Sequence, residues 1–439
     1  MATVAVNADA VQQAQPQERT ANIAFRFCFL YFGLYCLGTQ IVTSLFPIPK
    51  VDIPDLSTFW PMRPMVLWSA AHVFHVSPAP SFQDTGSGDR MFDYVLVFCL
   101  VVISALATAA WSLVDRKRDS YVALAKWFRV FIRFALAGQM ITYGLSKAIP
   151  MQMPFPFLKE LIEPFGNMSP MGVLWSSIGA SPAYETFAGC AELFGGILLI
   201  FPRTTTLGAL VCLADMIQVF MLNMTYDVPV KLLSFHLILL SLFLLAPECS
   251  RLMNFFFLNR TAQPSAQPAL FQTPRANRIA FATQILFGIW LLGMGAYGSW
   301  TSWHEYVGGR EKSALYGLWA VDQFSIDGQV RPPLLTDKDR WRMAIFDFPA
   351  YVSFQRMDDS FAPYGVTIDT KANALALTKG SDKNWHANLT YQRSTPDHLM
   401  IEGSMDSHQI HAEFHLIDRS KFLIVSHTIG QELERDKPA

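Results

Sequence analysis

Charged residues and cysteines are both scarce in this 439-residue chain. Asp, Glu, Lys and Arg make up 16% of it, against about 25% in an average soluble domain, and hydrophobic residues reach 51%. The net charge of −1 gives no basic excess, so no nucleic-acid partner is expected. The six cysteines lie in or beside apolar segments without a CxxC spacing, which favours buried thiols over a disulfide framework or a metal site.

Several common motifs are also missing. There is no Walker loop, GxGxxG, GxSxG or HExxH in a suitable context, and no CxxCH for covalent haem. ATP-driven work and covalently bound haem are therefore not expected. At the start, no cleavable signal stands out: residues 1–21 are predicted to form a disordered tail, and the first apolar run is long enough to remain as an anchor.

A relay of apolar segments between Asn22 and Trp300 dominates the chain. Residues 93–114 and 229–247 each run about 19–22 residues with almost no charge, the length that a helix needs to cross ~30 Å of hydrocarbon. Residues 59–76 contain one arginine, two histidines and two prolines, and suit an interfacial or re-entrant helix better than a span. We therefore predict a multipass α-helical membrane protein with seven spans, at residues 22–46, 93–114, 126–149, 182–201, 205–222, 229–246 and 278–298.

Lys and Arg residues gather in alternate loops. The loop 115–126 holds three consecutive basic residues at 116–118, the turn after the fourth span holds Arg203, and the loop 248–278 holds four arginines. With seven spans, these loops fall on the same side as the N-terminus, which the positive-inside rule makes cytoplasmic. We predict a bacterial inner-membrane protein whose C-terminal part is extracytoplasmic.

From about residue 316 onward, segments of strand length replace the long apolar runs. Residues 409–416 alternate polar and apolar, which predicts that Phe414 is buried while His411, Glu413 and His415 face outward. Two histidines and a carboxylate also suit zinc, but a solvated sheet face has the same pattern, and no metal is predicted. Eight strands with short connections predict a meander that closes as a small barrel or sandwich, at residues 317–326, 350–356, 365–369, 374–377, 386–392, 398–403, 409–416 and 422–427.

These patterns divide the chain into six segments. They are the tail (1–21), the first two spans with an outer loop and interfacial helix (22–128), a four-helix bundle (129–247), a cytoplasmic loop (248–277), the seventh span (278–300) and an extracytoplasmic all-β domain (301–439).

Residues 191–204, AELFGGILLIFPRT, place a glutamate and a glycine pair before a short Arg/Thr turn and a further apolar segment. The run YGLSK at 143–147 precedes them and NMTYD at 223–227 follows. This pattern resembles the membrane core of the DoxX-like family over residues 129–247 and, more remotely, the membrane part of vitamin K-dependent γ-carboxylases. The resemblance implies a four-helix bundle with quinone or lipid-phase chemistry. It does not extend to the first two spans or to the β domain.

Three ionisable residues lie near mid-membrane depth on consecutive predicted spans: Glu192, Asp215 and His236. A charge that faces lipid at the centre costs ~2.5–3.5 kcal/mol or more, so these residues are expected to face one another, Arg133 or Gln139, or a water-filled cavity. A polar network that only clamps helices, a redox or proton-transfer site and a transport path all fit this pattern.

A second group lies nearer the outer ends of the spans. Tyr143 and Lys147 share one helical face, and Glu185 and Glu192 share another. Lys147 is a candidate base if it is buried, whereas a lysine that extends to the membrane interface is the alternative. The expected rim of a ligand cavity consists of Tyr143, Lys147, Glu185 and Asp227, with Gln218 as a further ligand-binding candidate.

We predict that the bundle binds an apolar ligand, a quinone or a membrane lipid. A quinone is the candidate cofactor, and the enzymatic version is a quinone-linked oxidoreductase component with Glu192, Lys147, Asp215 and His236 as catalytic residues. One alternative is a non-catalytic membrane scaffold whose β domain recruits a protein partner. Another is a small-molecule carrier, although the inverted repeats expected of a carrier are not seen in the sequence.

Overall fold

The computed structural model describes residues 8–48, 51, 53–82, 88–116, 120–265, 269–380 and 382–426. Lys117 and Arg118 of the predicted basic loop, and His427 of the last predicted strand, lie outside the described residues. The chain divides into two compact units. The first comprises Met1–Gln152 and Ala183–Thr301, and the second comprises Met153–Pro182 and Ser302–Ala439.

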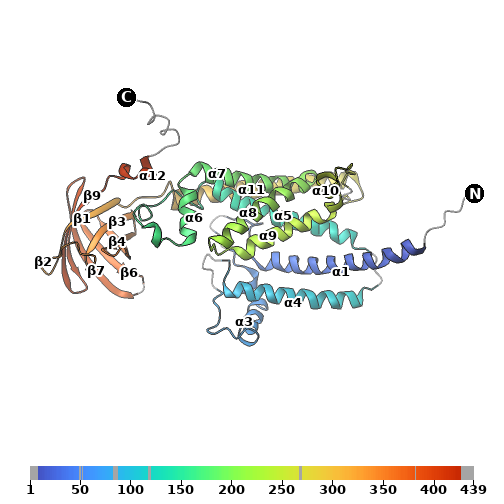
Figure 1. Ribbon diagram of the computed structural model, residues 1–439, viewed down its shortest axis with the longest axis horizontal. Coiled ribbons are helices and arrows are strands. Elements are labelled where there is room, and N and C mark those ends of the chain that lie inside the picture. The colour runs from blue at the N-terminus through green and yellow to red at the C-terminus, as the bar shows by residue number, and fades with distance from the viewer. Residues whose placement is uncertain are drawn as a thin grey trace, which may run out of the picture. The chain divides into compact units, whose positions relative to one another are not determined.

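The first unit is helical (Figure 1). Short 3₁₀ turns lie between its helices, at Leu56–Thr58, Pro202–Thr204 and Ala246–Glu248. Its α-helices are α1 (Ala8–Gly38), α2 (Gln40–Thr43), α3 (Met62–His72), α4 (Met91–Val114), α5 (Val122–Ala148), α7 (Pro182–Ile200), α8 (Thr205–Thr225), α9 (Lys231–Leu245), α10 (Cys249–Phe256) and α11 (Pro274–Tyr306).

Six of the described helical segments are long and apolar enough to cross a membrane, by length and composition. They are residues Ala21–Gly38 of α1, the helices α4, α7 and α11, and the segments Pro202–Thr225 and Lys231–Phe256. The sequence predicts seven spans, and the difference is α5. This helix is 27 residues long, but four basic residues interrupt its apolar character, at Lys126, Arg129, Arg133 and Lys147.

The helix ends differ from the predicted ones in two places. Helix α1 begins at Ala8, earlier than the predicted end of the N-terminal tail. The first predicted span is also broken near Thr39, which lies between α1 and the short α2. In the predicted interfacial segment, α3 occupies Met62–His72 and packs against α4.

The apolar core of this unit joins helices that are far apart in the sequence. It contains Phe92 and Leu100 of α4, Ile132 of α5 and Leu240 of α9, each fully buried. One buried cation ties three elements together: Arg26 of α1 donates hydrogen bonds to the Tyr121 hydroxyl (2.7 Å), the Ser112 hydroxyl (2.8 Å) and the Asp115 carbonyl (2.9 Å). A buried polar group is tolerated when its hydrogen bonds are satisfied, as they are here.

Loops predicted to share a membrane side come together in this unit. Lys126, Arg203 and Arg251, from three different basic segments, line one cavity. In the other set of loops, Asp89 accepts hydrogen bonds from the backbone N–H groups of Lys231 (2.7 Å) and Leu232 (2.9 Å), and so caps α9. Each of these contacts joins segments that the charge pattern assigns to one set of loops.

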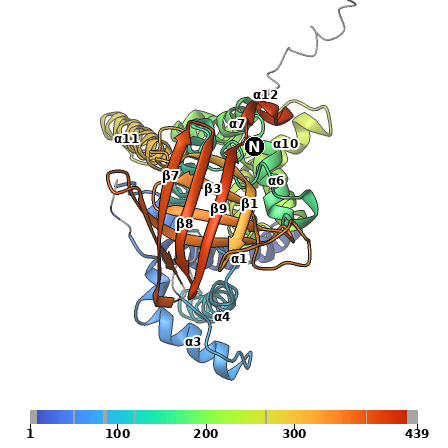
Figure 2. The same cartoon turned by 90° about the vertical axis from the view of Figure 1, so that its left-hand side faces the viewer.

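The second unit is a closed antiparallel β-barrel preceded by a helix, α6 (Pro170–Gly179). Eight strands, β1 and β3 to β9, form a meander in which β9 pairs back onto β1, and β2 extends β1 as a short hairpin (Figure 2). The strands are β1 (Gly317–Ile326), β2 (Gln329–Val330), β3 (Trp341–Phe348), β4 (Tyr351–Arg356), β5 (Phe361–Asp369), β6 (Ala374–Lys379), β7 (Asp382–Thr395), β8 (His398–Met405) and β9 (His408–Leu416).

The sequence prediction differs from the barrel at two elements. Strand β3 was not predicted, because its residues are buried almost continuously and do not alternate. The predicted strand at 422–427 is wrong: a 3₁₀ turn (Arg419–Lys421) and the short helix α12 (Leu423–Ser426) occupy this region. Because β9 already pairs with β8 on one side and β1 on the other, it has no free edge for a further strand.

Large side chains fill the barrel interior. Trp319, Phe324, Phe346, Phe354 and Phe414 are each at most 1% exposed and belong to one core cluster. This packing makes the barrel a solid domain with its own core. A closed barrel also leaves no sheet edge for further pairing.

Candidate functional site

A buried ion pair joins α5 to α7. The Lys147 ammonium lies 2.5 Å from Oε1 of Glu192, and the two side chains are only 9% and 5% exposed. The expectation that Glu192 faces the bundle and finds a partner on a neighbouring helix is confirmed. The alternative for Lys147, extension to the membrane interface, is wrong because the ammonium points inward to a carboxylate.

Glycines set the distance between the two helices. A Cβ on Gly144 of α5 would come within 2.6 Å of the Leu193 backbone nitrogen, and one on Gly189 of α7 would come equally close to the Gly144 carbonyl oxygen. Real Cβ atoms do not approach so closely, so both positions require glycine at this backbone separation. Close packing at glycines is a common device between membrane helices. Here it brings Lys147 within reach of Glu192.

A second carboxylate lies close to this pair. Asp215 of α8 is within electrostatic range of both Glu192 and Lys147. One carboxylate oxygen of each acid, Oε2 of Glu192 and Oδ2 of Asp215, is buried and has no hydrogen-bond partner among the described residues. One ammonium and two carboxylates thus share an interior region with spare acceptor capacity.

Tyr143 extends the cluster toward α2. Its hydroxyl accepts a hydrogen bond from Nε2 of Gln40 (3.1 Å), and the Lys147 ammonium lies 5.9 Å from its ring centroid. Gln139 donates to the Gln40 carbonyl (3.1 Å), so two α5 side chains bind one residue of α2. The sequence did not point to Gln40, because Gly38 marks the break near Thr39 only weakly: single glycines are frequent in membrane helices.

The remaining ligand-binding candidates are dispersed. Glu185 is fully buried and shares the inner face of α7 with Gly189 and Glu192. Gln218 is exposed on α8. Asp227 forms an exposed ion pair with Lys231 (2.7 Å), its own side chain being 83% exposed. Of the predicted rim, Lys147 pairs with Glu192 and lies near the Tyr143 ring, whereas the described ion pair of Asp227 is with Lys231.

His236 belongs to a separate polar group between α9 and α1. Its Nδ1 lies 2.6 Å from the Leu232 carbonyl oxygen, an acceptor only, so Nδ1 carries the hydrogen. In neutral histidine the other nitrogen is then an acceptor, and it receives the hydrogen bond of the Tyr31 hydroxyl at 2.7 Å. Tyr35 stacks on the ring with centroids 3.6 Å apart. The described contacts of His236 therefore satisfy it as a neutral, clamped side chain.

The outward face of β9 carries the three predicted polar residues. His411 contacts Glu402 of β8 (2.6 Å), and His415 contacts Asp322 of β1 (2.6 Å), so the two histidines are engaged with different strands. Hydrogen bonds from His408 and from the Gln409 backbone hold the pKa of the Asp327 carboxyl below its ordinary value. Within the described ranges, no three His, Cys, Asp or Glu side chains form a group suited to a metal ion.

Comparisons with known proteins give one relative without an assigned function. The chain is 28% identical over 143 residues to the uncharacterized protein YwoB of Bacillus subtilis (strain 168), and the match covers 30% of this chain and 85% of YwoB. No family model matches the chain. No solved structure matches it either.

Proposed function

We propose that the helical unit binds an apolar ligand, a quinone or a lipid, beside the Lys147–Glu192 pair and exchanges a proton with it. The observation that supports this is one buried ammonium close to two carboxylates. Lys147 compensates one carboxylate, and a second negative charge without compensation is costly in a low-dielectric interior, so the second acid is the proposed proton donor and acceptor. The buried oxygens without a described partner, Oε2 of Glu192 and Oδ2 of Asp215, are the proposed positions for that proton.

This chemistry suits a quinone. A quinone takes up protons at its oxygens when it is reduced, and a buried acid is the group that delivers them. The electrons come from a separate redox donor, so the residues described here account for ligand binding and proton transfer. A lipid with a polar hydroxyl near the membrane interior would use the same proton donor and acceptor.

The proposal includes seven spans in a bacterial inner membrane, with the N-terminus cytoplasmic and the β-barrel extracytoplasmic. Helix α5 is long enough to cross, and its apolar residues between Arg133 and Lys147 are mostly buried in the bundle. The gathering of Lys126, Arg203 and Arg251 around one cavity agrees with this topology. The match to a Bacillus subtilis protein is consistent with a bacterial setting.

Mass spectrometry of the lipids and quinones that co-purify with the protein tests the ligand. Wild-type protein should retain a quinone or a defined lipid, and Glu192→Gln and Lys147→Met should each lower its occupancy at least tenfold. Asp227→Asn is the matched control, because it removes a carboxylate from an exposed ion pair. Equal occupancy in all four proteins would refute the proposal.

A second candidate function, recruitment of a partner by the β domain, rests on an exposed apolar loop. Val330, Leu334 and Leu335 lie in and after the β2 hairpin and are 63%, 55% and 74% exposed. A photo-crosslinking residue at position 335 should capture a defined protein in cells, and Leu334→Ser should abolish the capture. Quinone or lipid retention should be unaffected by this change, which separates the two functions.

A further inference from the structure

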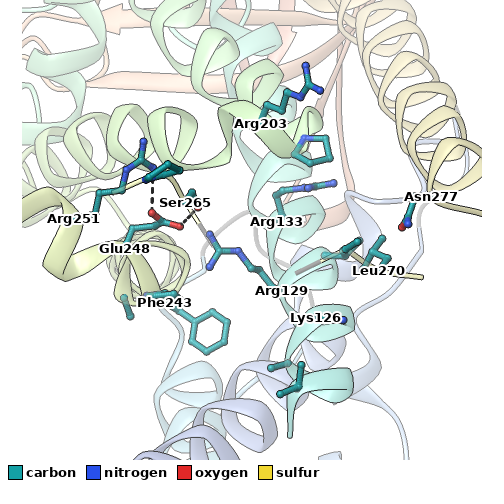
Figure 3. A pocket seen from close by; sticks show the side chains of 18 of the residues that line it. Lys126, Arg129, Arg133, Arg203, Phe243, Glu248, Arg251, Ser265, Leu270 and Asn277 are labelled. Atoms are coloured by element: carbon teal, nitrogen blue, oxygen red, sulfur yellow. Dashed lines mark hydrogen bonds and ion pairs between the residues drawn. The ribbon is translucent and has the colours of Figure 1, made fainter. Parts of the chain in front are cut away.

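A large cavity opens in the helical unit at the N-terminal end of α5. Its volume is about 1120 Å³, slightly above the usual range for ligand pockets of about 300–1,000 Å³. Its lining comes from the first turns of α5, the turn at Pro202–Thr204, residues between Phe243 and Ser265, residues 269–270, and the start of α11 (Figure 3). Arg133 and Lys147 are separated by about 21 Å of helical rise along α5, so this cavity is distinct from the proton-exchange site.

The lining is strongly basic. It contains five cations, Lys126, Arg129, Arg133, Arg203 and Arg251, and one acid, Glu248. Glu248 is already engaged, because it accepts hydrogen bonds from Ser265 (2.5 Å) and Arg251 (3.2 Å). Figure 3 shows Arg129 and Arg133 projecting from the same helix, with the Arg251–Glu248–Ser265 group on another part of the wall. The cavity thus holds positive charge that its own acid does not balance.

Two of these arginines keep buried donors unused. Arg133 is only 4% exposed, and although its Nη2 donates to Gln284, its Nε has no hydrogen-bond partner among the described residues. Nη2 of Arg129, one turn earlier, is also buried without a partner in that part of the chain. Like charges one turn apart on a helix repel each other. Arg26 is equally buried, but three residues accept hydrogen bonds from its guanidinium group. A buried arginine of this helical unit can therefore have its donors satisfied.

We infer that this cavity binds a phosphate group through Arg129 and Arg133. The planar guanidinium pairs with phosphate oxygens through two parallel N–H donors, and an anion placed between two arginines removes their repulsion. Phe243 and Phe281 line the same space, which suits a phosphate attached to an apolar group. Basic pockets between membrane helices commonly take anionic lipid headgroups, and a free phosphate presents the same oxygens.

Thermal stability of the full-length protein in neutral detergent tests this inference. One arm adds phosphatidylglycerol against phosphatidylcholine, and the other adds inorganic phosphate against chloride at equal ionic strength. The apparent Kd for the probe that stabilises the wild type, phosphatidylglycerol or inorganic phosphate, should rise at least tenfold in Arg129→Gln and Arg133→Gln. Stabilisation by phosphatidylglycerol alone identifies a lipid headgroup, and stabilisation by inorganic phosphate identifies a free phosphate. Both outcomes support the phosphate site.

Two matched variants distinguish weaker binding from a folding defect. Arg203→Gln changes an exposed residue of the lining and should weaken binding in a folded protein. Arg260→Gln removes the same charge from an exposed position outside the lining and should leave binding unchanged. If neither phosphate probe stabilises the wild type, or if Arg260→Gln weakens binding as much as Arg203→Gln does, the inference is overturned.

Discussion

At the scale of single residues, the sequence located the charged side chains of the bundle interior but did not show which of them pair with one another. Glu192, Lys147 and Asp215 were identified because ionisable residues are rare and costly inside spans. Their pairing depends on the rotation and separation of α5 and α7, which the glycine contacts set. A sequence gives depth along each helix, but the rotation of one helix against another depends on all of their packing contacts at once.

Removing one partner of the buried pair should cost more than removing both. Lys147→Met leaves Glu192 as an uncompensated buried charge, and we expect a loss of about 3–5 kcal/mol in the free energy of unfolding. The double variant Lys147→Met with Glu192→Leu should recover most of that loss, since apolar replacements of a buried pair are often neutral. Denaturation in mixed micelles measures both. A double variant less stable than either single one would contradict a direct pair.

For His236, depth along the helix did not predict the contacts of the side chain. Its depth placed it with Glu192 and Asp215, but the described partners of His236 are Tyr31, Tyr35 and Leu232. Helix α1 lies outside the resemblance to the DoxX-like bundle, so nothing in that comparison indicated an α1 partner. The aromatic residues of α1 are ordinary in a membrane span, and no spacing marks two of them as contacts for a histidine.

At the scale of elements, the alternation of β9 was a reliable guide. The same alternation predicts that Ile410, Ala412 and Leu416 are buried with Phe414. Ile410, Ala412 and Phe414 are buried and Glu413 and His415 are exposed, whereas Leu416 and His411 are only partly buried. Strand β3 shows why the same signal fails elsewhere. Asp347 looks like a turn residue, but it is buried in β3, where it accepts a hydrogen bond from the Leu158 backbone (2.8 Å) and pairs with Arg310. Its partners are remote in sequence, so local pattern could not reveal the strand.

The two faces of β9 should respond differently to truncation. Phe414→Ala removes a side chain that is 1% exposed in the barrel core, and we expect a loss of about 3–5 kcal/mol in unfolding free energy. His411→Ala removes a partly exposed contact with Glu402, which should cost about 0–1 kcal/mol. Chemical denaturation followed by tryptophan fluorescence compares them. Equal effects at the two positions would reject the inward orientation of Phe414.

The contact between α5 and α7 should be intolerant of a single methyl group. Gly189→Ala forces the two backbones apart, because its Cβ has no space beside the Gly144 carbonyl. We expect lower thermal stability and a weakened Lys147–Glu192 pair. Gly293→Ala on α11 is the control: a Cβ there meets nothing within 4 Å, and alanine is favoured over glycine in a helix by about 1 kcal/mol. Equal melting temperatures for the two variants would contradict glycine-dependent packing.

At the scale of the whole molecule, composition divided the chain correctly into a helical part and a β part. The sequence did not show that residues 153–182, which lie between two helices of the bundle, belong to the same compact unit as the barrel. Within that unit, Leu158 packs with Leu318 and Ile345 in a small core of its own. Short apolar segments between spans look alike in sequence whether they pack on a membrane domain or on a separate one.

The number of crossings decides where the barrel lies, and α5 is the helix on which that number depends. If α5 did not cross, its two ends would lie on one side, and the turn with Arg203 would face away from Lys126. Both residues line the same cavity, which supports the proposed crossing by α5. A phosphatase reporter fused after Ala439 should therefore be active, since this enzyme folds only outside the cytoplasm, whereas a fusion after Arg260 should be inactive. Green fluorescent protein at the same positions should give the reverse result. An active phosphatase after Arg260 together with an inactive one after Ala439 would show that α5 does not cross and would remove the extracytoplasmic placement of the barrel.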